Sequence, residues 1–375
     1  MTPARPAIAV LSRKALNRAL LERQLLLRRA TMPVLDAIEH LVGMQAQVPG
    51  NPYIALWSRL QAYRFDDLSR LITERRAVRT TMMRGTIHLF SARDALGLRS
   101  LMQPALERDV YPNVTFGKEK LDGLEMDAVL SAGRDLIDEA PRTAAQLREL
   151  LAPRWPDRDP AALAYAVRVL LPVVHVPPRG IWGRSGPIAF AVMESWLGDT
   201  LSIESAPDGL IMRYLAAFGP AMVADAATWS GLRGLREVFD RLRPSLRTFR
   251  DEQNRELFDL PDAPLPDADV PSPPRFLPEF DNVLLSHADR NRVIADGYRK
   301  AIATRNGAIP GTILVNGFVS GIWTIDRDKN GATLTIKPFE RIPKKDTAAL
   351  ESAAARLLTH TAADAPTRSV RFVHP

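Results

Sequence analysis

Two neutral amides, Gln45 and Gln47, form the pattern with the clearest chemical meaning in this sequence. Side chains two residues apart diverge on a helix but face the same way on an extended segment. Residues 49–52 contain two prolines and a glycine, which end a helix and favour extended backbone before them. We therefore expect the two amides to project together from a loop. Two solvent-exposed glutamines at a helix end would give the same pattern.

Other patterns that carry catalysis are missing from the chain. It has no cysteine and six scattered histidines, so we expect no disulfide, no thiolate chemistry and no catalytic metal. Paired carboxylates, a Ser-His-Asp set and a phosphate loop are also absent. Gly231 and Gly234 are too close together, and lack the preceding strand, for a dinucleotide site. We expect no cofactor.

Positive charge is concentrated in the first hundred residues. The 375 residues include 50 Lys plus Arg and 43 Asp plus Glu, a net charge of +7. Residues 1–100 hold 16 basic and 7 acidic residues, whereas the other 275 hold 34 and 36. A GC-rich genome would explain the excess of Arg over Lys but not this clustering. The amino-terminal region is therefore expected to bind a polyanion.

The overall composition is that of a globular protein, with 46% hydrophobic and 25% charged residues. No apolar run approaches the roughly 18 residues of a membrane span. We expect a soluble, cytoplasmic protein without a membrane partner.

Short helices followed by a hairpin are predicted in the first hundred residues. Ser12 is a suitable N-cap for the first helix. Apolar residues at three-to-four spacing predict helices within residues 12–27, 34–47, 53–62 and 67–76. Residues 78–83 and 86–90 are predicted as strands joined at Arg84-Gly85. This order is that of a winged helix-turn-helix.

The same order recurs twice along the chain. The second unit is predicted to have helices at 144–151 and 160–171, then strands at 173–176 and 181–182. The third is predicted to have helices at 210–218, 221–230 and 232–242, then strands at 246–249 and 256–260. Three such units favour tandem winged helices over one large enzyme core. An unrelated helical protein with incidental hairpins is the alternative.

A proline-rich segment separates these units from the C-terminal region. Seven of the 18 residues from Pro261 to Pro278 are proline, which predicts a stiff, extended connector. Beyond it we expect strands around Asn316-Gly317, a dipeptide that favours a tight hairpin, and a closing helix at 348–359. The predicted fold is α+β, with three tandem winged-helix units and a small β-rich C-terminal domain. The predicted boundaries are 1–100, 101–200, 201–260, 261–278 for the connector and 279–375.

Several motifs together resemble one family. They are Gln45 and Gln47 within residues 41–59, and then, in order, residues 84–89, 218–232 and 277–290. With these motifs the chain resembles the AlkZ-type bacterial DNA glycosylases, which are tandem winged-helix proteins. The motifs are specific to the family, and less specific to an activity, since many members are known only as DNA-binding.

The resemblance implies a C-shaped molecule that encircles duplex DNA and excises N7-alkylated purines, including those in interstrand crosslinks. The family's catalytic Gln-x-Gln motif maps onto Gln45 and Gln47; a second branch carries Gln-x-Asp, which this chain does not. An N7-alkylated purine is cationic and leaves without a proton, so amides that hold a water suffice. We expect Gln47 to align that water, Gln45 to support it, and Asn51 to position the loop or a phosphate.

Further candidate DNA contacts lie on the predicted turns and hairpins. They are Asn51, Arg84, Thr86, His88, Asp281, Asn282, Ser286, His287, Arg290, Arg292, Asn316 and Phe318. Structural alternatives exist for several of them. His88 could be a buried histidine satisfied by backbone, Asp281 could stabilise a turn, residues 287–292 could be a solvated turn, and Phe318 could either wedge into the minor groove or pack inward.

The expected protein is a monomeric glycosylase that binds double-stranded DNA largely independently of sequence, with an affinity that falls as salt rises. It should lack lyase activity, because no lysine lies between Lys14 and Lys118. One alternative is a winged-helix transcription regulator without catalysis, although regulators usually carry one reader per subunit. Another is a self-resistance factor that shields a DNA-bound toxin. Release of free alkylated base distinguishes the enzyme from both.

Overall fold

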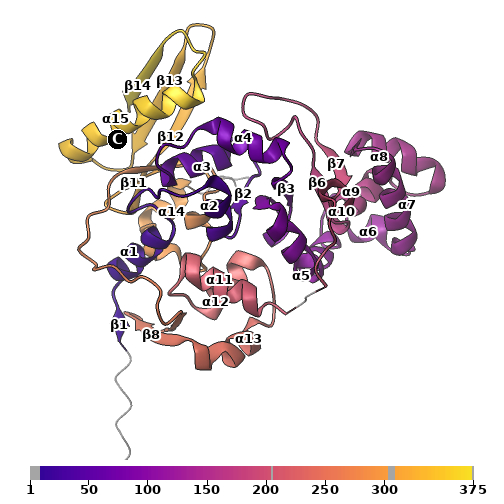
Figure 1. Ribbon diagram of the computed structural model, residues 1–375, viewed down its shortest axis with the longest axis horizontal. Coiled ribbons are helices and arrows are strands. Elements are labelled where there is room, and N and C mark those ends of the chain that lie inside the picture. The colour runs from indigo at the N-terminus through magenta and orange to yellow at the C-terminus, as the bar shows by residue number, and fades with distance from the viewer. Residues whose placement is uncertain (1–8, 204–205, 303–308, 374–375) are drawn as a thin grey trace, which may run out of the picture.

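The computed structural model describes residues 9–203, 206–302 and 309–373. These residues combine helices with three sheets, which confirms the predicted α+β class. Figure 1 shows residues 118–170 as a helical lobe on the right, residues 208–259 at the bottom and the C-terminal sheet at the upper left. The first hundred residues occupy the centre and contact all three (Figure 1).

The amino-terminal unit contains four helices and a hairpin. They are α1 (Arg13–Arg23), α2 (Val34–His40), α3 (Asn51–Arg59), α4 (Phe65–Thr73), β3 (Ala77–Thr81), the short 3-10 helix η1 (Met83–Gly85) and β4 (Ile87–Ser91). Ser12 caps α1, as predicted, with its Oγ accepting from the Ala15 amide at 3.2 Å. We call residues 77–91 the first hairpin.

Helix α2 is shorter than predicted. It ends at His40, whereas the sequence predicted an end near Gln47. Val42 and Gly43 have positive φ values of 53° and 78°, which break the helix and turn the chain into β2 (Met44–Gln45). The backbone is therefore already extended where the glutamines begin.

The second unit is mostly helical, with three short strands that join the sheet of the first unit. Its elements are α5 (Ala92–Val110), α6 (Lys118–Leu121), α7 (Met126–Glu139), β5 (Arg142–Thr143), α8 (Ala144–Leu151), η2 (Ala152–Arg154), α9 (Pro160–Leu170), β6 (Val173–His175), β7 (Ala189–Val192) and α10 (Met193–Leu197). The predicted strand at 181–182 was wrong, because β6 pairs with β7 instead. The ring of Trp182 packs against Tyr53 and Phe65, at centroid distances of 5.3 and 4.4 Å, which holds this segment away from the sheet.

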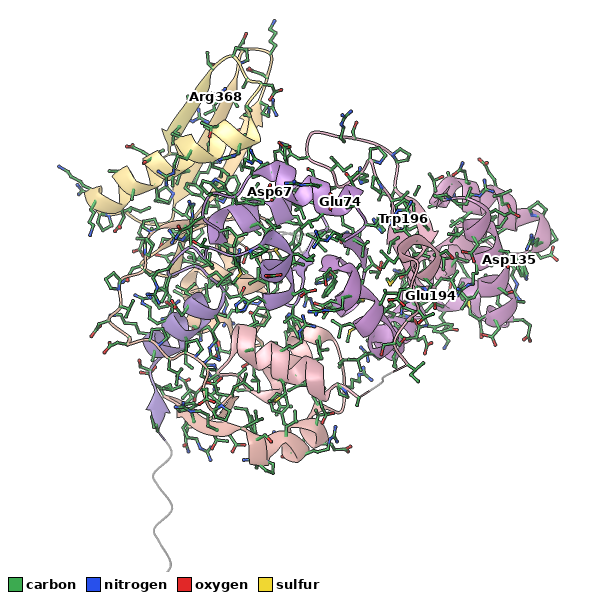
Figure 2. The ribbon with its side chains drawn as sticks, in the orientation of Figure 1. Asp67, Glu74, Asp135, Glu194, Trp196 and Arg368 are labelled. Atoms are coloured by element: carbon green, nitrogen blue, oxygen red, sulfur yellow. The ribbon has the colours of Figure 1, made fainter. Side chains whose placement is uncertain are left out.

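Strands from the first two units share one six-stranded sheet, in the order β2-β4-β3-β6-β7-β5. The two halves meet where β3 runs antiparallel to β6, with Arg79 opposite His175. A second contact lies on the outside, where the Arg75 guanidinium stacks 3.9 Å from the Trp196 ring centroid. Figure 2 shows Trp196 on the side of the second unit that faces the first, whereas Asp135 lies on its outer helices. Continuous backbone pairing thus connects the two predicted units.

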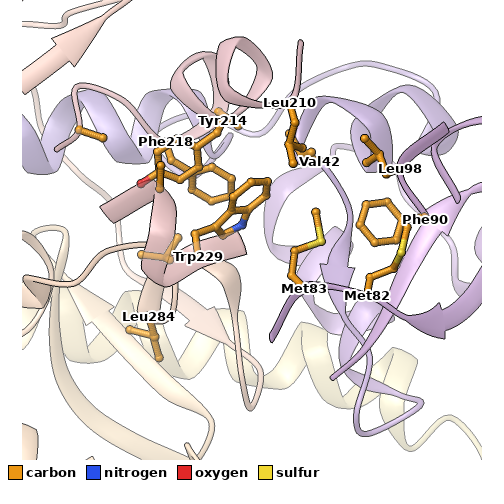
Figure 3. Packing of buried hydrophobic residues seen from close by; sticks show 14 of the residues in the cluster. Val42, Met82, Met83, Phe90, Leu98, Leu210, Tyr214, Phe218, Trp229 and Leu284 are labelled. Carbon is orange, nitrogen blue, oxygen red and sulfur yellow. The ribbon is translucent and has the colours of Figure 1, made fainter. Parts of the chain in front are cut away.

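The third unit packs against the turn of the first hairpin. Its elements are α11 (Asp208–Phe218), α12 (Val223–Ser230), α13 (Leu235–Leu242), η3 (Arg243–Ser245), β8 (Arg247–Asp251) and β9 (Glu256–Asp259), with β1 (Val10–Leu11) added parallel to β8. Figure 3 shows the aromatic side chains of Tyr214, Phe218 and Trp229 facing Met83 within one buried core. The turn of the hairpin therefore rests on the third unit.

The C-terminal region forms a five-stranded sheet covered by a helix. Its elements are β10 (Arg275–Leu277), η4 (Asn282–Leu284), η5 (Arg290–Arg292), α14 (Asp296–Ile302), β11 (Thr312–Val315), β12 (Phe318–Arg327), β13 (Ala332–Pro338), α15 (Lys344–Thr361) and β14 (Arg368–Phe372). The hairpin predicted at Asn316-Gly317 is confirmed, with φ values of 49° and 84°. The proline-rich segment is more than a connector, because its last residues form the edge strand β10.

Candidate active site

The segment that carries Gln45 and Gln47, which we call the Gln loop (residues 43–50), is fixed along the first hairpin. Gln45 lies opposite His88 in the β2–β4 pair, and the Ala46 amide donates to the Ile87 carbonyl at 2.7 Å. Gly43 is needed at the entry, because its φ is positive and a Cβ there would collide with the Phe90 ring. The Gln loop is thus a continuation of the sheet.

The Gln45 side chain points into the protein and is held at its carbonyl. Its residue is only 7% exposed, and Oε1 accepts from Arg84 Nη2 at 3.0 Å. Asn282 braces the loop from the other side, because its Nδ2 donates to the Gly43 carbonyl at 2.8 Å. Arg84 and Asn282 were both predicted as DNA contacts, and in the structure both position the Gln loop.

Arg84 lies at the turn of the first hairpin in a left-handed conformation, with φ 56°. Besides Gln45 its guanidinium donates to the Trp229 carbonyl, so the third unit helps to orient it. Burial, and secondarily the charge of Arg290, lower the pKa of Arg84 to about 10. Its side chain therefore stays cationic at neutral pH.

His88 is a buried, neutral histidine beside this arginine. Burial first, and then the charge of Arg84, lower the pKa of His88 to about 3. Its Nδ1 lies 3.0 Å from the Thr86 carbonyl, so Nδ1 carries the proton and donates. Nε2 then presents its lone pair to Arg84 Nη2 at 3.5 Å. His88 was predicted either to contact DNA or to be a buried histidine satisfied by backbone. The structure shows a buried histidine that donates to a backbone carbonyl.

Gln47 differs from Gln45 in being exposed. Its Oε1 accepts from the Ile87 amide at 3.3 Å, which leaves a second lone pair on that oxygen. Gln47 lines a cleft of about 310 Å³ between the first hairpin, α5 and α9. The other polar and aromatic residues on this cleft include Arg84, Asp109, Tyr165, Arg168 and His175. One glutamine is therefore held in the interior, and the other faces a cavity beside the same hairpin.

Arg79 fixes the peptide between the two glutamines. It is 2% exposed, and its Nη2 donates to the Ala46 carbonyl at 2.8 Å. Burial, and secondarily the charge of Arg179, lower the pKa of Arg79 to about 10. Arg79 could not be predicted from the sequence, because nothing in the spacing of a strand residue marks it as a neighbour of the Gln loop.

The far end of the Gln loop is held by the second unit and by the C-terminal region. Tyr53 donates from its hydroxyl to the Gly180 carbonyl at 2.8 Å and accepts from the Trp182 amide at 3.1 Å. Asn51, predicted to position the loop or a phosphate, is buried and donates to the Glu279 carbonyl at 2.8 Å. Three parts of the chain thus converge on residues 43–53.

Besides Asn51, His88 and Asn282, four further predicted DNA contacts are buried and engaged inside the protein. Asp281 forms an ion pair with Arg59 at 2.8 Å. Ser286 and His287 are hydrogen-bonded to each other at 3.0 Å, and Arg292 donates to the Pro220 carbonyl at 2.8 Å. These side chains offer almost no surface to a DNA backbone. In the structure they instead hold parts of the protein together.

The C-terminal hairpin turn is packed against α1. The Asn316 Oδ1 accepts from Arg18 Nη2 at 2.6 Å, and the Phe318 ring lies 4.8 Å from the Arg13 guanidinium. The turn is thus packed against α1, with Asn316 exposed and Phe318 half-buried, and its contact with the minor groove stays a prediction. Among the remaining candidates, Thr86 is half-buried with its hydroxyl donating to the Met83 carbonyl at 3.1 Å, and Arg290 is half-buried near Arg84.

Within residues 9–203, 206–302 and 309–373, no group of three or more His, Asp or Glu side chains is arranged to hold a metal ion. No helix in the same ranges is long and apolar enough to span a bilayer.

Comparison with known proteins gives three consistent results. The family model "DNA glycosylase AlkZ-like" matches residues 38–360. The interstrand DNA cross-link repair glycosylase of Streptomyces sahachiroi is 27% identical over 356 residues, which cover 87% of this chain and 91% of the relative. The solved structure of DNA glycosylase AlkZ from the same organism has a TM-score of 0.76 at 23% identity, and it covers 97% of this chain and 100% of that one. This structural likeness shows a shared fold.

Proposed function

The chain belongs to the AlkZ-like family of DNA glycosylases, and from this we propose that it hydrolyses the N-glycosidic bond of N7-alkylated purines in duplex DNA, including purines joined in interstrand crosslinks. The relative named for crosslink repair supports the second part. The observation that carries the proposal is the Gln loop, with Gln45 oriented by Arg84 and Gln47 at the mouth of a cleft.

Two neutral amides match the chemistry of a cationic leaving base. Alkylation at N7 puts a positive charge on the purine, so the base departs without a proton from a general acid. What remains is to place a water beside the anomeric carbon as positive charge develops on the sugar. The free lone pair of Gln47 Oε1 accepts a hydrogen bond from that water, and Gln45 supports its orientation; once the water oxygen has bonded to the anomeric carbon, its proton is released to solvent.

The proposed reaction leaves an abasic site and an intact strand. A lyase step needs an amine that attacks the sugar, and no lysine lies between Lys14 and Lys118. The proposed step uses only side chains of this chain.

The DNA complex is proposed to be a C-shaped clamp of tandem winged helices around the duplex, formed by one monomer. The excess of basic residues in the first hundred positions supports docking on the phosphate backbone. Binding should then depend little on sequence and weaken steeply as salt rises.

Two duplexes test the proposed function, one with a single N7-methylguanine and one with a single N7–N7 interstrand crosslink. We expect release of free base from the first and separation of the strands of the second, with strand scission only after alkaline treatment. Binding to both duplexes with no release of base would refute the enzyme and favour a regulator or a shielding factor.

A further inference from the structure

Four arginines lie in or next to the cleft that Gln47 lines, and we call Arg79, Arg84, Arg168 and Arg179 the arginine cluster. Arg84 and Arg168 line the cleft, and Arg79, Arg168 and Arg179 all act electrostatically on His175, which lines it too. Within the described parts of the chain, none of the four has a carboxylate oxygen within 4.0 Å of its guanidinium. Two buried arginines elsewhere in the protein do have a counter-ion. Arg23 and Arg59 each form an ion pair with a buried aspartate, at 2.7 and 2.8 Å.

Several buried ring and guanidinium nitrogens in and beside the cluster have no hydrogen-bond partner among the described residues. Arg79 uses only Nη2, towards Ala46, and its Nε and Nη1 are buried with no partner in the described structure. Nε of Arg179 is also buried without a partner there, and so is Nδ1 of His175, a residue that lines the cleft. Buried charge without a counter-ion is costly, so an arrangement of this kind indicates an anion that completes it.

Arg168 is the member of the cluster that opens onto the cleft of Gln47. It is half-buried on α9 and stacks on Tyr165, with 5.3 Å from its guanidinium carbon to the ring centroid. Burial lowers the pKa of Arg168, although an arginine remains cationic at neutral pH. Asp109, the one acidic residue among the described residues that line this cleft, already faces Arg108 at 3.4 Å.

We propose that this cleft binds one phosphate of the DNA backbone, next to the damaged nucleotide, and that Arg168 contacts it directly. This inference rests on the proposed function, because it places the sugar of that nucleotide beside Gln47. Arg84 adds charge from the hairpin side of the cleft, while Arg79 and Arg179, which do not line it, raise the positive potential through their charge. The phosphate is the counter-ion that the protein itself does not supply.

The test uses duplexes that cannot react. Each carries a tetrahydrofuran abasic analogue and one neutral methylphosphonate, moved through the positions on either side of the analogue. For the wild type, we expect one position to weaken binding about 10-fold, as for loss of a charge-assisted hydrogen bond. Arg168→Met should bind the unmodified duplex about 10-fold more weakly, lose about one unit of salt slope and show no effect at that position.

Arg148→Met is the matched control, because Arg148 is exposed on α8 of the same unit. It should retain the full methylphosphonate effect. Arg168→Gln repeats the test with a polar side chain should the methionine variant fail to fold. Equal methylphosphonate sensitivity in the wild type and both Arg168 variants, at every position, would overturn the proposal. Because binding to the analogue needs no catalysis, this result is independent of whether the wild type releases N7-methylguanine.

Discussion

Replacing Arg84 by methionine tests whether orientation of Gln45 matters for the rate. The substitution keeps the aliphatic length of the side chain and removes the donor that holds Gln45 Oε1 at 3.0 Å. A hydrogen bond from a charged group contributes about 1.5–3 kcal/mol. If that energy is used to orient Gln45 in the transition state, the hydrolysis rate should fall about 10- to 150-fold.

The assay is the single-turnover release of N7-methylguanine at saturating enzyme, for Arg84→Met, Gln45→Ala and the double variant. Arg84 should act through Gln45, so adding Arg84→Met to Gln45→Ala should cost at most about 3-fold more. Arg75→Met is the control, because Arg75 also donates to a backbone carbonyl, that of Trp196 at 3.0 Å, but far from the Gln loop. Rate losses that multiply in the double variant would refute a role of Arg84 through Gln45.

Three further predictions concern the framework of the site. Because the pKa of His88 is lowered from 6.5 to about 3 in the folded state, its contribution to stability is present above pH 6.5 and is lost as pH falls towards 3. From pH 7 to 5.5 the free energy of unfolding in urea should fall by about 1.3 kcal/mol less in His88→Gln than in the wild type, and an equal fall would contradict the assignment. Gly43→Ala should destabilise the protein by about 1–3 kcal/mol and slow base release, because it meets Phe90 at a positive φ; an unchanged urea midpoint and rate would argue against this. Asn282→Ala should cost about 1–3 kcal/mol and lower the rate while DNA affinity stays within about 3-fold, since Asn282 braces the Gly43 carbonyl; a loss of affinity alone would indicate a DNA contact instead.

Local chemistry made much of the secondary structure predictable. Helix α8 was predicted at its observed bounds, and in the structure Thr143 and Gln146 form a capping box that fixes its start. The Asn316-Gly317 turn was predicted because both residues tolerate positive φ. The extended backbone at Gln45 was predicted from the prolines downstream, but in the structure it begins at the turn of Val42 and Gly43, which ends α2 earlier than expected.

The contacts that build the candidate site come from distant parts of the chain and could not be predicted. Arg84 lies 39 positions from Gln45 in the sequence, and Asn282 lies 239 positions from Gly43. No periodicity encodes such pairings, so both residues were predicted as DNA contacts rather than as supports. Trp182 shows the same limit, because its apolar side chain suggested a strand and its packing against Tyr53 and Phe65 was set by another unit.

The role of the glutamine pair is tested most directly by single-turnover base release from a duplex with one N7-methylguanine, for the wild type, Gln45→Ala and Gln47→Ala. Binding of each variant to the same duplex is measured in parallel. We predict that Gln47→Ala slows release about 100-fold or more and that its DNA affinity stays within about 3-fold of the wild type. Release by Gln47→Ala at the wild-type rate would contradict the assignment of hydrolysis to the Gln loop.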